Sequence, residues 1–121
     1  MNENACILVC VTVQRDCDRL IRQGKALSLK TGEPLHVLHV CSGKNLLGNP
    51  DAAEALNYLF SLAHEVDAEM NILYEADVPA AIARYAAAHG AATLILGPDK
   101  SGFAARLRKL LSPNAQLLCE P

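Results

Sequence analysis

Two short apolar runs place the strongest constraint on the fold of this chain. The run CILVCV, residues 6–11, is almost unbroken, and ATLIL, residues 92–96, leads directly into Gly97 and Pro98. A strand that is apolar on both faces needs a layer of helices on each face, as in parallel α/β sheets. The loop at residues 97–102 should therefore border the crevice beyond the carboxyl ends of the strands, where α/β proteins bind ligands.

The apolar period alternates along the chain between strand and helix, which indicates βαβ units. The strands are predicted at Ala5–Val13, Leu35–Cys41, Glu69–Tyr74, Ala92–Leu96 and Ala115–Cys119. Helices are predicted from Asp16 or Cys17 to about Lys30, from a cap at Asp51 to about Val66, from Asp77 to the residue before Gly90, and at Phe103–Leu111. Gly32 and Gly90 are expected to end helices in the left-handed conformation. The second helix is expected to present one apolar face, made of Leu56, Leu59, Phe60 and Ala63.

Right-handed crossovers leave few ways to arrange five parallel strands. The flavodoxin-like order 3-2-1-4-5, with helices on both faces, places the most apolar strand at the centre and the alternating strand Glu69–Tyr74 at an edge. The default ligand site then lies between the first and fourth strands. It is expected to be formed by residues 11–14, 40–43 and 97–102.

Composition limits the class of protein. The 121 residues, 51% of them hydrophobic, suffice for one domain over residues 1–121. A net charge of -2 and a pI near 6.0, without a basic stripe, argue against nucleic acid as a partner. Residues 1–4 lack the features of a signal peptide, and no apolar run is long enough for a membrane span. Five cysteines without a CxxC pair favour reduced thiols and a cytoplasmic protein.

The order of motifs resembles the universal stress protein family over essentially the whole chain. The resemblance rests on ILVCV, LHVLHV and HGAATLILGPDKSG, the last of which precedes a basic terminal helix. The segment CDRLIRQGKALSLKTG, residues 17–32, is closer still to the stress-protein-like domain of the sensor histidine kinase that controls bacterial potassium uptake. The resemblance implies the adenine nucleotide alpha hydrolase-like variant of the sheet.

The resemblance also locates a nucleotide site, from which this sequence departs. The nucleotide-binding members carry an Asp at the end of the first strand and a Gly-x2-Gly-x9-Gly-Ser/Thr loop. Thr12 stands at the Asp position, Gly97 matches the first glycine, Lys100 stands at the second, and Leu110 and Leu111 stand at the last pair. Gly102 and Ser112 are the residues that could take over through small insertions. Lys100, Ser101 and the helix after Gly102 form either an anion cradle or an ordinary surface turn. The candidate binding residues are Thr12, Val13, Val40, Gly97, Asp99, Lys100, Ser101, Gly102 and Ser112.

No set of residues predicts catalysis or a metal site. His36 and His39 are three apart in a strand, so their side chains point to opposite faces and cannot share a metal. Cys17 is a candidate reactive thiol, because it lies near a helix N-terminus and between Arg15 and Arg19. The other cysteines are expected to be inert.

Two functions from different classes remain open. The favoured one is a regulatory or stress-response module without catalytic turnover, which acts through a protein partner and needs no cofactor. The alternative is a stress protein that binds ATP, another adenine nucleotide or a cyclic dinucleotide through a modified phosphate loop. A thiol sensor based on Cys17 is a third, lesser hypothesis. The resemblance further implies a homodimer through the last strand, at Gln116, Leu117 and Leu118.

Overall fold

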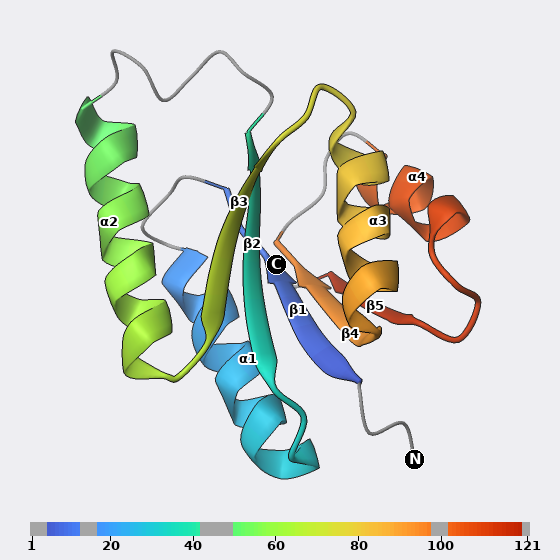
Figure 1. Cartoon of the computed structure of the whole chain (residues 1–121), viewed down its shortest axis with the longest axis horizontal. Helices are drawn as coiled ribbons and strands as arrows, with labels where there is room; N and C mark the ends of the chain where they lie inside the picture. The colour runs from blue at the N-terminus through green and yellow to red at the C-terminus, as the bar shows by residue number, and fades with distance from the viewer. Residues whose placement is uncertain (1–4, 13–16, 42–49, 98–101, 120–121) are drawn as a thin grey trace.

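The computed structural model describes residues 5–12, 17–41, 50–97 and 102–119, with side chains from residue 53 onward in the third range. Strands and helices alternate along the chain (Figure 1): β1 (Cys6–Cys10), α1 (Asp18–Thr31), β2 (Leu35–Cys41), α2 (Pro50–Glu65), β3 (Glu69–Tyr74), α3 (Val78–His89), β4 (Ala91–Leu96), α4 (Phe103–Leu110) and β5 (Gln116–Cys119). The strands form one parallel sheet in the order β3-β2-β1-β4-β5. The predicted order is confirmed.

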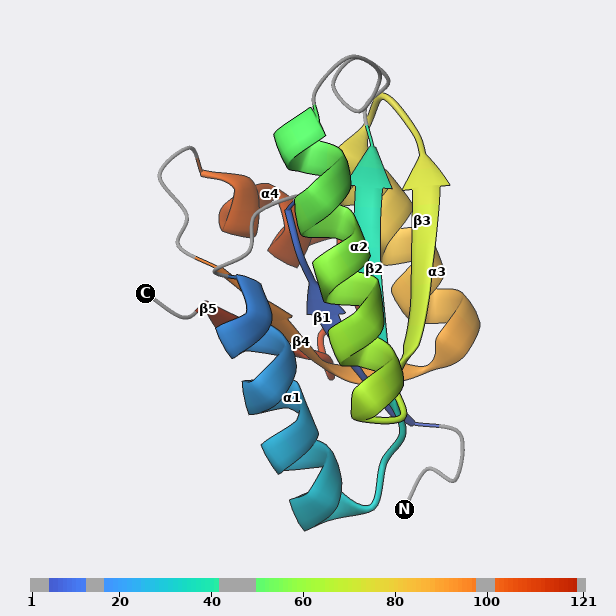
Figure 2. The same cartoon turned by 90° about the vertical axis from the view of Figure 1, so that its left-hand side faces the viewer.

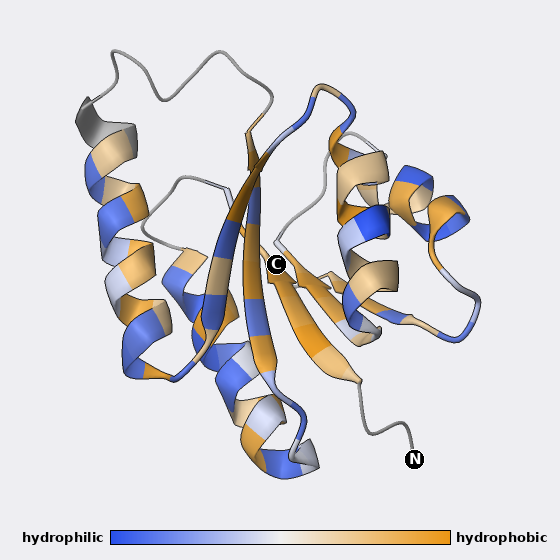
Figure 3. Ribbon diagram, viewed as in Figure 1, coloured by the Kyte–Doolittle hydropathy of each residue, from blue (hydrophilic) through white to orange (hydrophobic). Residues whose placement is uncertain are grey.

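Helices α1 and α2 cover one face of the sheet, and α3 and α4 cover the other (Figure 2). Because side chains alternate along a strand, β1 contributes to both cores. Ile7 and Val9 pack in the core beneath α1 and α2, whereas Leu8 packs in the core beneath α3 and α4. The central strands are apolar and the helices carry polar residues on their outer surfaces (Figure 3). This explains why the run CILVCV has no polar alternation.

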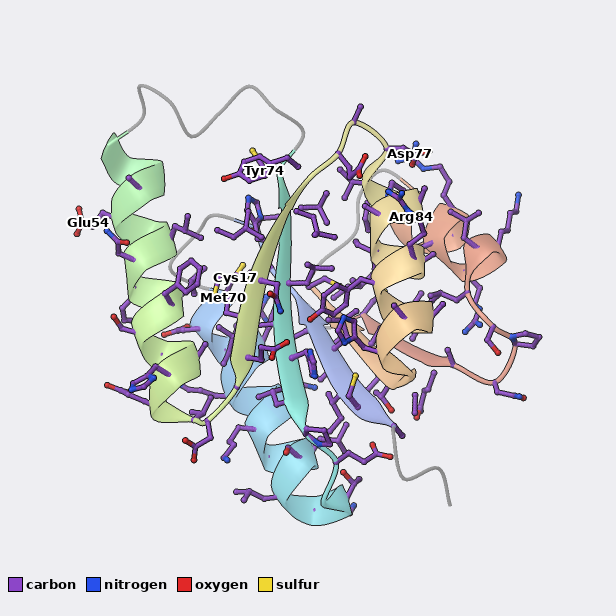
Figure 4. All side chains as sticks on the ribbon, viewed as in Figure 1. Cys17, Glu54, Met70, Tyr74, Asp77 and Arg84 are labelled. Atoms are coloured by element: carbon purple, nitrogen blue, oxygen red, sulfur yellow. The ribbon has the colours of Figure 1, made fainter. Side chains whose placement is uncertain are left out.

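The helix ends follow capping chemistry. The Asp77 carboxylate accepts a hydrogen bond from the Ala80 amide at 3.2 Å, which satisfies one free N–H at the start of α3 (Figure 4). Gly32 and Gly90 end α1 and α3 with positive φ angles of 79° and 65°. The predicted caps at Gly32, Asp77 and Gly90 are confirmed. None of the described helices has the length and apolar surface needed to cross a membrane.

Two predicted boundaries were wrong. The first strand ends at Cys10 and not at Val13. The Val11 amide still donates to the Leu38 carbonyl of β2 at 2.9 Å, but the Thr12 hydroxyl already contacts the residue that precedes α1. Asp51 does not cap α2, since that helix already includes Pro50.

The predicted apolar face of α2 was also partly wrong. Phe60 is 38% exposed, whereas Ala55, Leu59 and Leu62 are buried against the sheet. Phe60 directly follows Leu59, and one residue turns the helix by about 100°. A ring at this position therefore projects beside the buried stripe rather than within it.

Candidate functional site

The carboxyl ends of β1 and β4 lie side by side at the centre of the sheet. Val9 pairs with Ile95, so the segment after β1 begins next to the segment after β4. From here the chain continues to β2 and β3 on one side and to β5 on the other. Such a switch point is where open α/β sheets bind ligands. We call it the switch-point edge and define it by the described residues Val11, Thr12, Val40, Cys41, Gly97 and Gly102.

The side chain of Thr12 is engaged with α1. Its Oγ1 lies 3.4 Å from the Sγ of Cys17, the residue that precedes α1. Thr12 itself is exposed, but Cys17 is only 7% exposed. A hydroxyl is a shorter and uncharged substitute for the carboxylate expected at this position in a nucleotide site. Here that hydroxyl is paired with a buried thiol.

The backbone that leads to Thr12 is tied to β2 by a histidine. His39 is 8% exposed, and its Nδ1 lies 3.0 Å from the carbonyl oxygen of Val11. Because a carbonyl oxygen only accepts, Nδ1 must donate and therefore carries the hydrogen. The sequence indicates a structural histidine here but not its partner, since the partner depends on the register of β1 against β2.

The two described glycines after β4 have different surroundings. A Cβ atom built on Gly97 would lie 3.5 Å from Leu20 of α1, so Gly97 is in ordinary contact with that helix. Gly102 precedes α4 with a φ of 76°, and a Cβ atom there would have no atom within 4 Å. Gly102 has no side chain that could cap α4, and the start of this helix carries the positive end of the helix dipole.

The structure does not bring all the predicted binding residues together. Val13, Asp99, Lys100 and Ser101 lie outside the described residues. Ser112 follows α4, whose 8 residues run back from the carboxyl edge of the sheet, and it leads into β5. A helix of that length spans about 12 Å. Ser112 instead forms a turn, in which its Oγ accepts from the Asn114 amide at 3.3 Å.

Val40 is the remaining residue that was predicted to line the binding site. Its side chain is half-buried and packs with the core beneath α3 and α4. Thr12, by contrast, contacts Cys17 at the beginning of α1. The two predicted residues therefore lie near the same edge but contact helices on different faces of the sheet.

The cysteines show what burial does to thiol chemistry. Burial, with smaller effects from the charges of Glu33 and Glu69, raises the pKa of Cys6 to about 11. Burial raises the pKa of Cys10 to about 12. Both thiols thus stay protonated at neutral pH, in agreement with their predicted inertness. Cys17 lies at the start of α1 as predicted, but its burial opposes the access that a sensor thiol needs.

Histidines do not form a metal site in the part of the chain that the structure describes. His36 contacts Tyr85 of α3, whereas His39 bonds to the end of β1, so the two point to opposite faces as predicted. Among the described residues, no three His, Cys, Asp or Glu side chains come together in a way that could hold a metal ion. The sequence did not reveal the polar contacts of Tyr85, because they join residues from three separate elements.

Comparison with known proteins supports the fold. Neither a protein-family model nor a curated protein matches the sequence. Solved structures do match. The universal stress protein from Archaeoglobus fulgidus in complex with dAMP has a TM-score of 0.71 at 21% identity, over 95% of this chain and 96% of that one. UspA from Lactobacillus plantarum has a TM-score of 0.72 at 14% identity, over 98% and 99%.

A third structure, a universal stress protein in complex with cAMP, has a TM-score of 0.66 at 11% identity and covers 95% of each chain. These likenesses extend over nearly the whole of both chains. The chain therefore has the fold of the universal stress proteins, as the order of its motifs predicted.

Proposed function

We propose that this chain is a universal-stress-protein-like regulatory module of the cytoplasm, which acts without catalytic turnover and without the usual ATP-binding loop. The whole-length fold likeness and the motifs ILVCV, LHVLHV and HGAATLILGPDKSG support the family. Five free cysteines support a reducing compartment. The likeness of residues 17–32 to the domain in the potassium-uptake sensor kinase remains part of this proposal.

One observation carries the nucleotide-independent role. The position at which nucleotide-binding members have an Asp holds Thr12, and the Thr12 hydroxyl is paired with the Cys17 thiol at 3.4 Å. A nucleotide would have to replace that contact and would gain only a neutral partner. Charge-assisted hydrogen bonds are roughly twice as strong as neutral ones, so the loss of the carboxylate weakens the anchor.

The connection between β4 and α4 supports the same conclusion. Only residues 97–102 separate the two elements. Counted from Gly97, the Gly-x2-Gly-x9-Gly-Ser/Thr pattern would reach its last pair at Leu110 and Leu111, which lie at the far end of α4. This short connection supports a loop that departs from the usual phosphate-binding pattern.

The alternative is a nucleotide-binding stress protein with a modified phosphate loop. Proteins of the same fold have been solved with dAMP and with cAMP, although they are only 21% and 11% identical to this chain. The N-terminus of α4 after Gly102, with the positive end of its helix dipole, is the feature of this chain that favours it. In this case Lys100 and Ser101 would assist the helix in holding a phosphate.

The partner would be either a second copy or a regulatory protein. β5 is an edge strand, because β4 is its neighbour on one side and the sheet ends on the other. Gln116 on this strand is exposed, and Leu117 and Leu118 are half-buried. An uncovered edge offers unpaired backbone groups to another strand. We therefore place the dimer contact at Gln116, Leu117 and Leu118.

A thermal-shift panel separates the two functions. The protein is melted with ATP, ADP, AMP and cyclic dinucleotides, and copurified molecules are identified by mass spectrometry. A nucleotide at a hundredfold its dissociation constant stabilises a protein by about 2.7 kcal/mol, a clear shift. We expect no shift for the native chain. A shift, or a copurified adenine nucleotide, would overturn the favoured function and support the alternative.

Two variants sharpen this test. Thr12→Asp supplies the missing carboxylate, and Thr12→Val is the matched control that removes the hydroxyl at nearly constant volume. If the missing carboxylate at position 12 prevents nucleotide binding, Thr12→Asp should show a nucleotide-dependent shift in melting temperature and Thr12→Val should not. If neither variant shows a shift, the lack of binding is due to the short loop instead.

A further inference from the structure

A polar cluster lies at the amino edge of the sheet, on the face covered by α3. His36 is the second residue of β2, Glu69 and Asn71 belong to β3, and Tyr85 and His89 belong to the last turns of α3. The Tyr85 oxygen lies 2.8 Å from His36 Nδ1 and 2.8 Å from Asn71 Nδ2. The His89 ring stacks on the Tyr85 ring at 4.0 Å between centroids. This edge is opposite the switch-point edge.

The donors and acceptors in this cluster can be assigned from their chemistry. Asn71 Nδ2 also lies 3.0 Å from the Glu69 carboxylate, which only accepts, so the amide nitrogen and not the amide oxygen faces both groups. Asn71 therefore donates one hydrogen to Glu69 and one to the Tyr85 oxygen. The single hydrogen of Tyr85 is then free to go to His36 Nδ1. This arrangement needs a neutral His36 whose hydrogen is on Nε2.

A proton on His36 reverses this bond. Protonated Nδ1 becomes a donor, and it faces the Tyr85 oxygen at 2.8 Å and Glu69 at 3.4 Å. Tyr85 then accepts from both His36 and Asn71, and its own hydrogen loses its acceptor. A buried polar hydrogen without a partner costs stability. The bond between β2 and the end of α3 therefore depends on the protonation of one imidazole.

The surrounding groups shift the pKa of His36 in both directions. Burial lowers the pKa of His36 and nearby His89 lowers it further, while Glu69 raises it. The His36 and His89 rings are 5.1 Å apart, so two cations would repel. From β1, Cys6 faces the cluster as a neutral thiol whose pKa is raised to about 11, and Glu33 acts on that thiol from the segment before β2.

We propose that His36, Tyr85 and Asn71 form a proton-operated latch, in which protonation of His36 releases the last turn of α3 from β2. The neutral latch holds that turn against the sheet through the Tyr85 hydroxyl. In the acid form His36 is the donor in this hydrogen bond, so the Tyr85 hydrogen is left without an acceptor in the cluster, and the charged His36 ring lies 5.1 Å from the His89 ring. The device is independent of any ligand at the switch-point edge, since it lies at the other end of α3.

The tautomer of His36 is the first test and needs no variant. Nitrogen-15 NMR of the native protein at pH 7.5 should show His36 as the neutral form with hydrogen on Nε2, and the His36 pKa should be below 6.5. A hydrogen on Nδ1 at that pH, or a pKa at or above 6.5, would overturn the latch.

Hydrogen exchange of the amides of residues 85–90 tests the release itself. After correction for the intrinsic pH dependence of exchange, protection of these amides should fall between pH 7 and 5. The loss is at most about tenfold for each unit by which folding lowers the His36 pKa. His36→Gln should abolish this fall, because the Gln carbonyl accepts from Tyr85 at any pH. His64→Gln, on the exposed last turn of α2, should leave it unchanged. An equal fall in His36→Gln and the native protein would overturn the proposal.

Discussion

Gly24 of α1 lies so close to Val9 of β1 that there is no room for a side chain between them. A Cβ atom built on Gly24 would lie 2.6 Å from Cγ2 of Val9 and 2.8 Å from Cδ1 of Leu35. Both neighbours are buried, and Val9 is β-branched and stiff about χ1. The glycine thus sets the distance between α1 and the two central strands.

Substitution Gly24→Ala should destabilise the protein, although alanine is the better helix former. Overpacking a core costs about 1–3 kcal/mol, whereas helix propensity returns at most about 1 kcal/mol. We expect a net loss of about 1–2 kcal/mol in urea unfolding. Ala26→Gly, on the exposed side of the same helix, measures how much the difference in helix propensity between alanine and glycine changes the free energy of unfolding, without a change in core packing. A Gly24→Ala protein as stable as the native one would show that α1 can move outward freely.

The cap of α3 gives a second prediction. Asp77→Ala removes the acceptor for the Ala80 amide and should lower the free energy of unfolding by about 1 kcal/mol. Asp77→Ser keeps an oxygen acceptor at this position and is the matched control. Thermal melts should therefore rank the native protein and Asp77→Ser above Asp77→Ala. A melt of Asp77→Ala indistinguishable from the native one would mean that the 3.2 Å bond is not held in solution.

The fold was predictable from the sequence because each element carries its own signal. The unbroken run Cys6–Val11 specified a central strand, and the alternation in Glu69–Tyr74 specified an edge strand. Gly32 and Gly90 marked helix ends by the same logic. These signals are local, and the right-handed crossover then left few orders for the strands.

The contacts at the sheet edges were not predictable, because they depend on register and helix phase. The bond from His39 to Val11 requires the pairing of β1 with β2 to be known to the residue. The close approach of Gly24 to Val9 requires the rotation of α1 about its axis. Ser112 shows the same difficulty, since it was a candidate only if small insertions shifted the spacing counted from Gly97, whereas α4 carries it to the other edge.

Stability should fall as the solution becomes alkaline. The pKa of Cys10 is raised to about 12 by burial, so the folded protein holds a proton that the unfolded chain releases above its ordinary value of 9.0. Because the folded state then binds more protons than the unfolded state, the free energy of unfolding decreases as pH rises from 9 toward 12. Cys6 adds to this loss up to about pH 11 and Tyr85 adds to it up to about pH 12.

Denaturant unfolding at pH 8 and pH 10.5 measures this loss. Cys10→Ala removes one of the contributing groups and should show a smaller decrease between the two pH values than the native protein. Cys119→Ala, on the exposed end of β5, is the control and should decrease as the native protein does. The same decrease in all three proteins would contradict the assignment to Cys10.

The accessibility of the thiols is a separate prediction that tests the sensor hypothesis. Iodoacetamide at neutral pH should label Cys119 first, because it is the exposed cysteine, and should label Cys17 more slowly than a free cysteine. Mass spectrometry of peptides after timed labelling gives the order. Labelling of Cys17 ahead of Cys119 would restore Cys17 as a reactive thiol despite its burial.

The β5 edge yields the last prediction, which concerns assembly. If two copies pair through β5, a lysine at an exposed position of this strand should place like charges across the contact and leave unpaired edges in water. Gln116→Lys is suited to this test because Gln116 is exposed and contributes to neither core cluster. Ser61→Lys adds the same charge to the exposed surface of α2 and is the matched control.

Sedimentation velocity should show the native protein and Ser61→Lys as dimers and Gln116→Lys as a monomer with an unchanged melting temperature. A dimer that persists in Gln116→Lys would move the contact away from this strand, and a native protein that sediments as a monomer would leave β5 free for a different partner.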